Sequence, residues 1–214
     1  MALLNDIRVD TRDRNLLLTF FVTGISLLAI AGVLALLMLL VRTPAISIGS
    51  STLYYRALTG HSVFMFIFWL AFIQTGLLIT AGTVLIGRRL WSLRLGWVGY
   101  GFMAAGVVCA AVGILMGAET SYLAPVPLSI QYSGTPLVYT AFILLSVGMG
   151  LIVTNFIMTM VTAVEHKESF NSWATFLRDI PISTFAAIAG LFIAIPGLIL
   201  SLKVFIPALL WSLG

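Results

Sequence analysis

The sequence predicts an all-α integral membrane protein with five transmembrane helices, a cytoplasmic N-terminus and a C-terminus outside. Three observations predict this fold. Apolar residues make up 61% of the 214 residues and charged residues only 8%, whereas a soluble domain carries about 25% charged residues. Five apolar runs are long enough to cross a bilayer, because about 20 helical residues match its hydrocarbon core. Finally, lysine and arginine gather in alternate connections between these runs.

The five runs follow one another through a single membrane domain that covers residues 1–214. In chain order, the predicted spans are about 16–42, 58–87, 96–117, 136–164 and 182–212. Each is expected to be helical, because in lipid only a helix satisfies every backbone polar group within its own segment. Pro196 and Pro207 fall inside the fifth run. Since proline removes a helical hydrogen bond, we expect this span to be kinked or to end early.

The basic residues predict the orientation. Arg42 and Arg56 lie on one side of the predicted membrane, and Lys203 lies inside the last span. The other eight lysines and arginines lie on the opposite side: Arg8, Arg12, Arg14, Arg88, Arg89, Arg94, Lys167 and Arg178. Positive residues favour the cytoplasmic side, so the second span starts outside. His61 is then expected about one helical turn below the outer surface.

His61 is the residue with the most chemical content, in the stretch "LYYRALTGHSVFMFIFWLAF". An ionisable residue within a span is costly unless it is paired or functional, and neutral imidazole is the commonest metal ligand. At helical spacing, Phe64, Met65 and Phe68 share the face of His61, and their surface suits a porphyrin. The stretch favours a haem site with His61 as axial ligand to the iron. The alternative is a histidine that hydrogen-bonds a neighbouring helix beside an ordinary packing stripe.

A family resemblance strengthens the haem hypothesis. The segment "YYRALTGHSVFMFIFWLAFIQTGLLI" is similar to the second helix of the catalytic subunit, subunit I, of haem–copper oxygen reductases. There a YY-x-x-LT-x-H entrance carries an axial histidine of the low-spin haem. "MGAETSYLAPVPL" resembles the family's external loop, and "SWATFLRDIPISTFAAIAGLFIAIPGLILSLKVFIPALLWSLG" resembles its fifth helix. The resemblance is closest to the B-type branch, because "WLAFIQTGLLITAG" stands where A-type members have a Gly-Gly-Phe-Gly-Asn motif.

The resemblance implies more ligands than the chain contains. In this family the low-spin haem takes two axial histidines, and the oxygen site takes three on copper and one on a second haem. This chain has two histidines in total. His166 follows the fourth span, about a membrane thickness from His61, so the two are not expected to share one iron. The chain is therefore expected to bind no copper and to share a low-spin haem with a membrane partner chain that carries the remaining helices and histidines.

The sequence thus predicts the N-terminal part of a split terminal oxidase subunit, working in electron transport with other respiratory subunits in a prokaryotic plasma membrane. It would belong to an oxidoreductase complex without a complete active site of its own, and no catalytic residue is predicted in it. Alone, the chain is expected to leave Phe64, Phe68 and Phe72 without facing helices. Two alternatives stay open: a homodimeric membrane cytochrome joined through paired His61 residues, and a haem-free scaffold or assembly subunit.

Weaker patterns have two interpretations each. Gly113 and Gly117 form a G-x-x-x-G pattern, which serves either association with another chain or an internal helix contact. Arg56 and Tyr55 stand where haem propionates are expected from the resemblance, or form an ordinary interfacial belt. Four polar residues in the inner half of the second span either carry protons or bond their own backbone, and we favour the latter: Gln74, Thr75, Thr80 and Thr83.

Overall fold

The computed structural model describes residues 11–43, 49–118, 133–165 and 172–214. Within these ranges the chain is helical and contains no strand. Five helices are long and apolar enough to cross a membrane: Thr11–Arg42, Ser51–Gly82, Leu93–Leu115, Thr135–Ala163 and Ile182–Ser212. The all-helical prediction with five candidate spans is confirmed. The second span ends at Gly82 rather than near residue 87, because a turn occupies residues 83–87.

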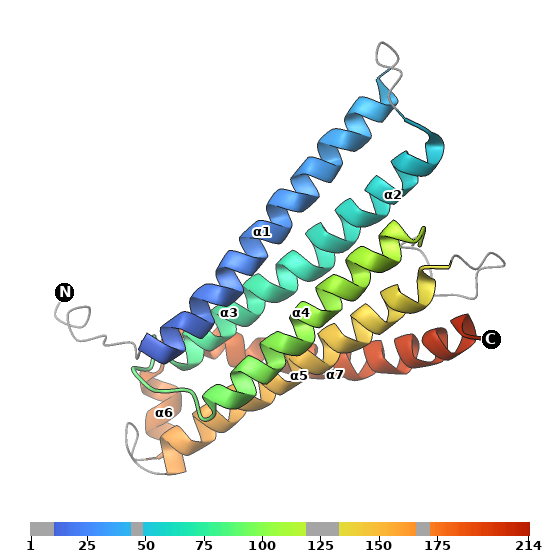
Figure 1. The fold of residues 1–214 in the computed structure, drawn as a ribbon. Coiled ribbons are helices and arrows are strands. Elements are labelled where there is room, and N and C mark those ends of the chain that lie inside the picture. The colour runs from blue at the N-terminus through green and yellow to red at the C-terminus, as the bar shows by residue number, and fades with distance from the viewer. Residues whose placement is uncertain (1–10, 44–48, 119–132, 166–171) are drawn as a thin grey trace.

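The helices form a bundle in which chain neighbours alternate in direction (Figure 1). In chain order, its elements are α1 (Thr11–Arg42), α2 (Ser51–Ser62), the π-helical η2 (Val63–Trp69), α3 (Leu70–Gly82), α4 (Leu93–Leu115), α5 (Thr135–Glu165), α6 (Trp173–Asp179) and α7 (Ile182–Ser212). The continuous helix α2–η2–α3 packs against α1, and α5 packs against α4, α3 and α7. The start of α1 and the end of α7 lie at opposite ends of the bundle (Figure 1).

Helices α4 and α5 approach each other so closely that glycine is needed at the contact. A Cβ atom on Gly106 would stand 2.8 Å from the carbonyl oxygen of Ala141, and one on Gly148 would stand 2.7 Å from that of Gly99. A Cβ on Gly113 would stand 2.8 Å from the carbonyl oxygen of Gly134, just before α5, and 2.9 Å from a side-chain carbon of Val138 on α5. For Gly113, the G-x-x-x-G pattern therefore serves an internal contact. In contrast, a Cβ on Gly101 would meet nothing within 4 Å.

Polar side chains of α1 and α5 fix the connection between α3 and α4. The amide nitrogen of Ser92 donates to Oδ1 of Asn155 over 3.1 Å, and Nδ2 of Asn155 donates to the Ser92 carbonyl over 2.8 Å. The amide of Trp91 donates to the hydroxyl of Thr159, and that of Leu90 donates to the carboxylate of Asp13. Since Ser92 also caps the N-terminus of α4, these bonds set where α4 begins.

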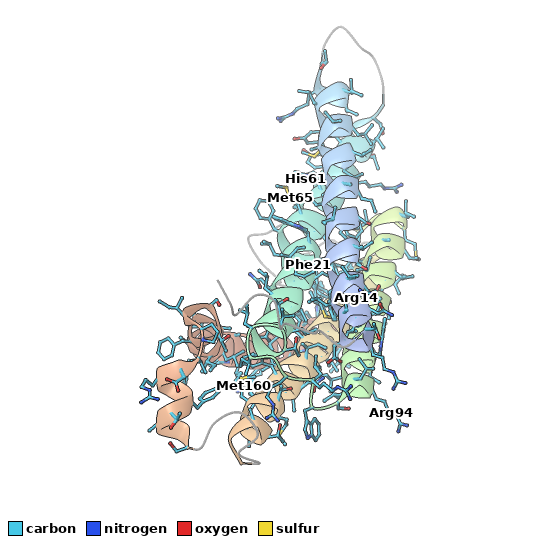
Figure 2. The ribbon with its side chains drawn as sticks, turned by 90° about the vertical axis from the view of Figure 1, so that its left-hand side faces the viewer. Arg14, Phe21, His61, Met65, Arg94 and Met160 are labelled. Carbon is cyan, nitrogen blue, oxygen red and sulfur yellow. The ribbon has the colours of Figure 1, made fainter. Side chains whose placement is uncertain are left out.

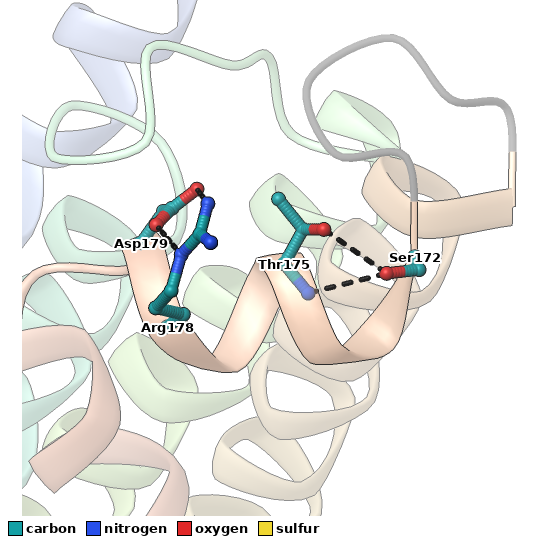
Figure 3. A network of polar contacts seen from close by, with 4 residues as sticks. All are labelled: Ser172, Thr175, Arg178 and Asp179. Atoms are coloured by element: carbon teal, nitrogen blue, oxygen red, sulfur yellow. Dashed lines mark hydrogen bonds and ion pairs between the residues drawn. The ribbon is translucent and has the colours of Figure 1, made fainter.

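The short helix α6 is an element that the sequence did not predict. The hydroxyl oxygen of Ser172 accepts from the amide nitrogen of Thr175 over 3.2 Å, which satisfies a free donor of the first turn. At the other end, Arg178 donates to both carboxylate oxygens of Asp179, over 2.7 and 3.1 Å (Figure 3). This helix carries the chain from α5 into α7.

Helix α7 runs through Pro196 and Pro207 as far as Ser212, so of the two expected outcomes, a kink or an early end, the early end does not occur. Few of its residues are buried. In its most apolar stretch of 18 residues, 6% of the stretch is buried inside the bundle, against 50% in the corresponding stretch of α5. It packs against α5 and α3. The hydroxyl of Thr184 donates to the carbonyl of Ala81 on α3 over 2.9 Å. The ring of Phe205 lies tilted against that of Phe142 of α5, with ring centroids 4.9 Å apart.

Candidate functional site

His61 lies where the second spanning helix changes its geometry. It is the penultimate residue of α2, and the π-helical segment η2 begins two residues later, at Val63. π-Helical turns are rare and are frequently found at functional sites. The apolar sequence "VFMFIFW" carries no signal that separates a π-helix from an α-helix, so sequence reasoning missed this feature.

The imidazole of His61 is held by the backbone of α1. Its Nδ1 atom lies 2.8 Å from the carbonyl oxygen of Ala31. A carbonyl can only accept, so Nδ1 carries the hydrogen, and in the neutral ring the free lone pair is on Nε2. Small residues allow this approach: Ala31 is fully buried, and a Cβ on Gly60 would stand 2.8 Å from Cδ1 of Leu34. The arrangement leaves one nitrogen of His61 for a ligand.

The four predicted site residues do not share one open face. His61 and Met65 are partly exposed and lie close together on the same helix (Figure 2). By contrast, Phe64 is 7% exposed and Phe68 is fully buried. A shared face for His61, Phe64, Met65 and Phe68 was predicted from α-helical spacing. The last three of these residues lie in the π-helical segment, where the spacing around the helix is different.

The expectation that the aromatic residues lack facing helices is wrong. Phe68 packs beside Gly106 of α4. Its ring carbon Cε1 lies 3.4 Å from the position that a Cβ on Gly106 would occupy. Phe72 contacts Phe20 of α1 and Tyr100 of α4, with ring centroids 5.8 and 5.9 Å away. Phe64, Phe68 and Phe72 are thus part of the chain's own core.

Arg56 lies over the C-terminal end of α4. Its Nη2 atom is 3.2 Å from the position that a Cβ on Gly117 would occupy, and Gly117 has a φ of +99° that favours glycine. A cation near the end of a helix is stabilised by the partial negative charge there. The Nε atom of Arg56 is buried and has no hydrogen-bond partner among the described residues. Tyr55 is 50% exposed.

The threonines in the C-terminal half of the second span bond their own helix. The hydroxyls of Thr75, Thr80 and Thr83 donate to carbonyls four residues earlier, over 2.6, 2.9 and 2.7 Å. For these three residues the backbone interpretation is confirmed. Gln74 differs, because its amide is exposed and makes no hydrogen bond with a described residue.

The described residues form no cluster of three or more His, Cys, Asp or Glu side chains that could hold a metal ion. His166 directly follows α5 and lies outside the described residues. Among the described residues, His61 would therefore act as a single metal ligand. Its fixed Nδ1 hydrogen and its free Nε2 lone pair fit one axial position on a haem iron.

Comparison with known proteins gives one match. The family model described as "Cytochrome C and Quinol oxidase polypeptide I" matches residues 15–213. Curated proteins and solved structures give no match. The matched range includes His61 and nearly all of the five membrane-spanning helices.

Proposed function

Because the chain belongs to the cytochrome c and quinol oxidase polypeptide I family, we propose that His61 supplies one axial imidazole to a low-spin haem. Members of this haem–copper oxidase family bind haem and work in membrane oxidase complexes. The hydrogen bond of 2.8 Å from Nδ1 of His61 to the Ala31 carbonyl carries the proposal. When bound, the haem would supply the redox centre that accepts an electron and passes it on.

The backbone of α1 acts on the ligand in two ways. By accepting from Nδ1, the Ala31 carbonyl fixes the tautomer and the plane of the His61 ring. It also leaves the Nε2 lone pair as the one free for a ligand. Because Ala31 is fully buried, water does not compete for this bond. The ring is therefore oriented before any ligand arrives.

The other three residues have different proposed parts. Met65 is partly exposed beside His61, so its thioether is available for contact with a macrocycle. Phe64 and Phe68 expose 7% and 0% of their surface, which leaves little area for a direct contact. Their proposed part in cofactor binding is to support the helix wall that carries His61, packing 6.2 Å apart between ring centroids.

The second axial ligand belongs to a partner chain in this proposal. Low-spin haem in the family takes two histidines, and the two histidines of this chain are separated in the sequence by η2, α3, α4 and α5. The chain is then the N-terminal portion of a B-type catalytic subunit divided between polypeptides, with its N-terminus in the cytoplasm of a prokaryote. The partner supplies the remaining histidines, including those for copper, and other respiratory subunits complete the complex.

Expression with and without the partner tests the proposal. Purified alone, the chain should be colourless or show a weak five-coordinate spectrum, because one histidine leaves the iron a free axial position. Purified with the partner chain, it should show a six-coordinate low-spin haem. Stoichiometric bis-histidine haem in the isolated chain would instead establish a homodimeric cytochrome. A complex with the partner but without haem in this chain would establish a scaffold or assembly subunit.

A further inference from the structure

A cavity of about 570 Å³ lies between α3, α5 and α7. Several of its lining side chains, such as Gln74 and Leu77, are exposed, so the cavity opens to the surface. Small residues predominate on the α7 wall, which is lined by Ser183, Ala186, Ala187, Gly190, Leu191 and Ala194. A Cβ on Gly190 would meet nothing within 4 Å. The cavity therefore has room for backbone to approach α7.

Two contacts attach α7 to α3 and α5 at different points along its length. Near the start of α7, the hydroxyl of Thr184 donates to the Ala81 carbonyl over 2.9 Å. Nearer its end, the ring of Phe205 lies tilted against that of Phe142, with ring centroids 4.9 Å apart. The lining residues of α7, from Ser183 to Ala194, precede Phe205 along the helix. The cavity is therefore a bounded site in the bundle, and α7 is fixed at both of these points.

Two polar groups of the cavity wall have no partner among the described residues. They are the amide of Gln74 on α3 and the hydroxyl of Ser183 on α7, both exposed. The bond between Thr184 and Ala81 sets Ser183 near the level of Ala81. Gln74 precedes Ala81 by seven residues, which is two helical turns or about 10 Å. Gly190 follows Ser183 by seven residues and so lies near the level of Gln74.

These groups favour a polar-bearing helix over a lipid chain as the occupant. In hydrocarbon, an amide without a hydrogen-bond partner is unfavourable, and an acyl chain offers neither donor nor acceptor. A helix that packs against small residues can bring polar side chains to both groups. We propose that this cavity receives a transmembrane helix of the partner chain, with polar side chains seven residues apart that bond Gln74 and Ser183. This inference rests on the proposed function, since it names where the partner docks.

A photo-crosslinking phenylalanine analogue at position 190, in the complex isolated from its native membrane, tests the occupant. We expect a crosslink to a membrane-spanning peptide of a different, histidine-bearing chain, with polar residues seven apart. The same analogue at position 101 should not give that crosslink, because Gly101 lies on α4, away from the cavity. Adducts with lipid alone, with a second copy of this chain, or with a peptide that lacks the polar pair would overturn the inference.

Substitutions provide a second measurement. Gly190→Phe should fill the cavity and lower the amount of co-purified partner by about tenfold or more, while Gly101→Phe should leave it unchanged. Gln74→Leu should lower it about threefold, as expected for one hydrogen bond in a membrane. Full assembly of Gly190→Phe would overturn the docking site and leave the haem proposal standing. A wild-type chain that assembles with no second chain would refute the proposed function itself.

Discussion

Ala31 and His61 are 30 residues apart in the chain, and their hydrogen bond of 2.8 Å joins the first spanning helix to the second. The orientation of the imidazole therefore depends on the position of α1 as well as on the helix that carries it. Changes to either helix should be visible in the spectrum of a haem bound at this site. The first two predictions follow from this dependence.

Replacing His61 by glycine should abolish the low-spin haem signal of the assembled complex, because the free Nε2 lone pair is lost. Added imidazole should restore part of the signal by occupying the space of the missing ring. Optical spectra of the reduced complex measure both effects. His166→Ala is the matched control and should keep its full haem content. An unchanged spectrum in the His61 variant would refute the ligand assignment.

Ala31→Leu should alter the haem spectrum without removing the ligand. Ala31 is fully buried at the contact between α1 and α2, so three added carbon atoms push the helices apart and weaken the bond to Nδ1. Overpacking of this kind destabilises by about 1–3 kcal/mol. Electron paramagnetic resonance of the oxidised haem reports the changed ligand orientation. Val33→Leu, at a residue that is 65% exposed on the same helix, should give the wild-type spectrum.

Gly148→Leu should lower the unfolding temperature of the chain in detergent. The new Cβ would lie 2.7 Å from the Gly99 carbonyl oxygen, and backbone cannot move aside as a flexible side chain can. We expect a loss of about 1–3 kcal/mol. Gly101→Leu adds the same atoms where nothing lies within 4 Å and should unfold like the wild type. Equal unfolding temperatures for both variants would contradict the close contact of α4 and α5.

Asn155→Leu should destabilise the start of α4. The substitution keeps a side chain of similar size but removes both hydrogen bonds to Ser92. The amide of Ser92 is then left without its partner, which is expected to cost about 1–3 kcal/mol, whereas the Ser92 carbonyl still accepts from the amide of Gly96 over 3.1 Å. Hydrogen exchange at the amide of Ser92 should become faster. Thr154→Val serves as the control, because Thr154 is exposed and bonds only its own helix. Unchanged exchange at Ser92 in the Asn155 variant would count against this link.

Arg178→Gln should raise the pKa of Asp179 toward its ordinary value. In the wild type, the hydrogen bonds from Arg178, aided by its charge, hold the pKa of Asp179 below that value. Because the pKa of Asp179 is lower in the folded state, its ionised carboxylate stabilises the fold at pH values above the unfolded-state pKa. This stabilisation is lost as the pH falls through the folded-state pKa. Both side chains are largely exposed, so the unfolding temperature should hardly change. Carboxyl NMR titration measures the pKa, and an unchanged value in the variant would contradict the pairing.

The sequence predicted the number and order of the spanning helices because length and hydropathy decide them in a membrane. It did not predict which aromatic residues are covered. In lipid, an apolar side chain is equally suited to the core and to the outer surface, so Phe64 and Phe66 look alike in the sequence. In the structure they are 7% and 57% exposed.

The candidate site was predictable only in part. An uncharged run with one histidine singles out His61, since ionisable residues within spans are rare. Its partner Ala31 could not be predicted, because the bond uses a backbone carbonyl and every residue has one. Short polar helices such as α6 carry no apolar period and were missed for that reason.

The π-helical segment below His61 amounts to one additional residue within an otherwise α-helical span. If Val63–Trp69 formed a regular α-helix with the same number of residues, the wider π-helical turns would no longer accommodate this additional residue. The half that carries His61 would then turn by about 100° and shift by about 1.5 Å relative to the half that carries Phe72. The imidazole would leave the Ala31 carbonyl while the sequence still contained every proposed site residue. The π-helical turn therefore accommodates the additional residue and keeps the imidazole of His61 at the Ala31 carbonyl.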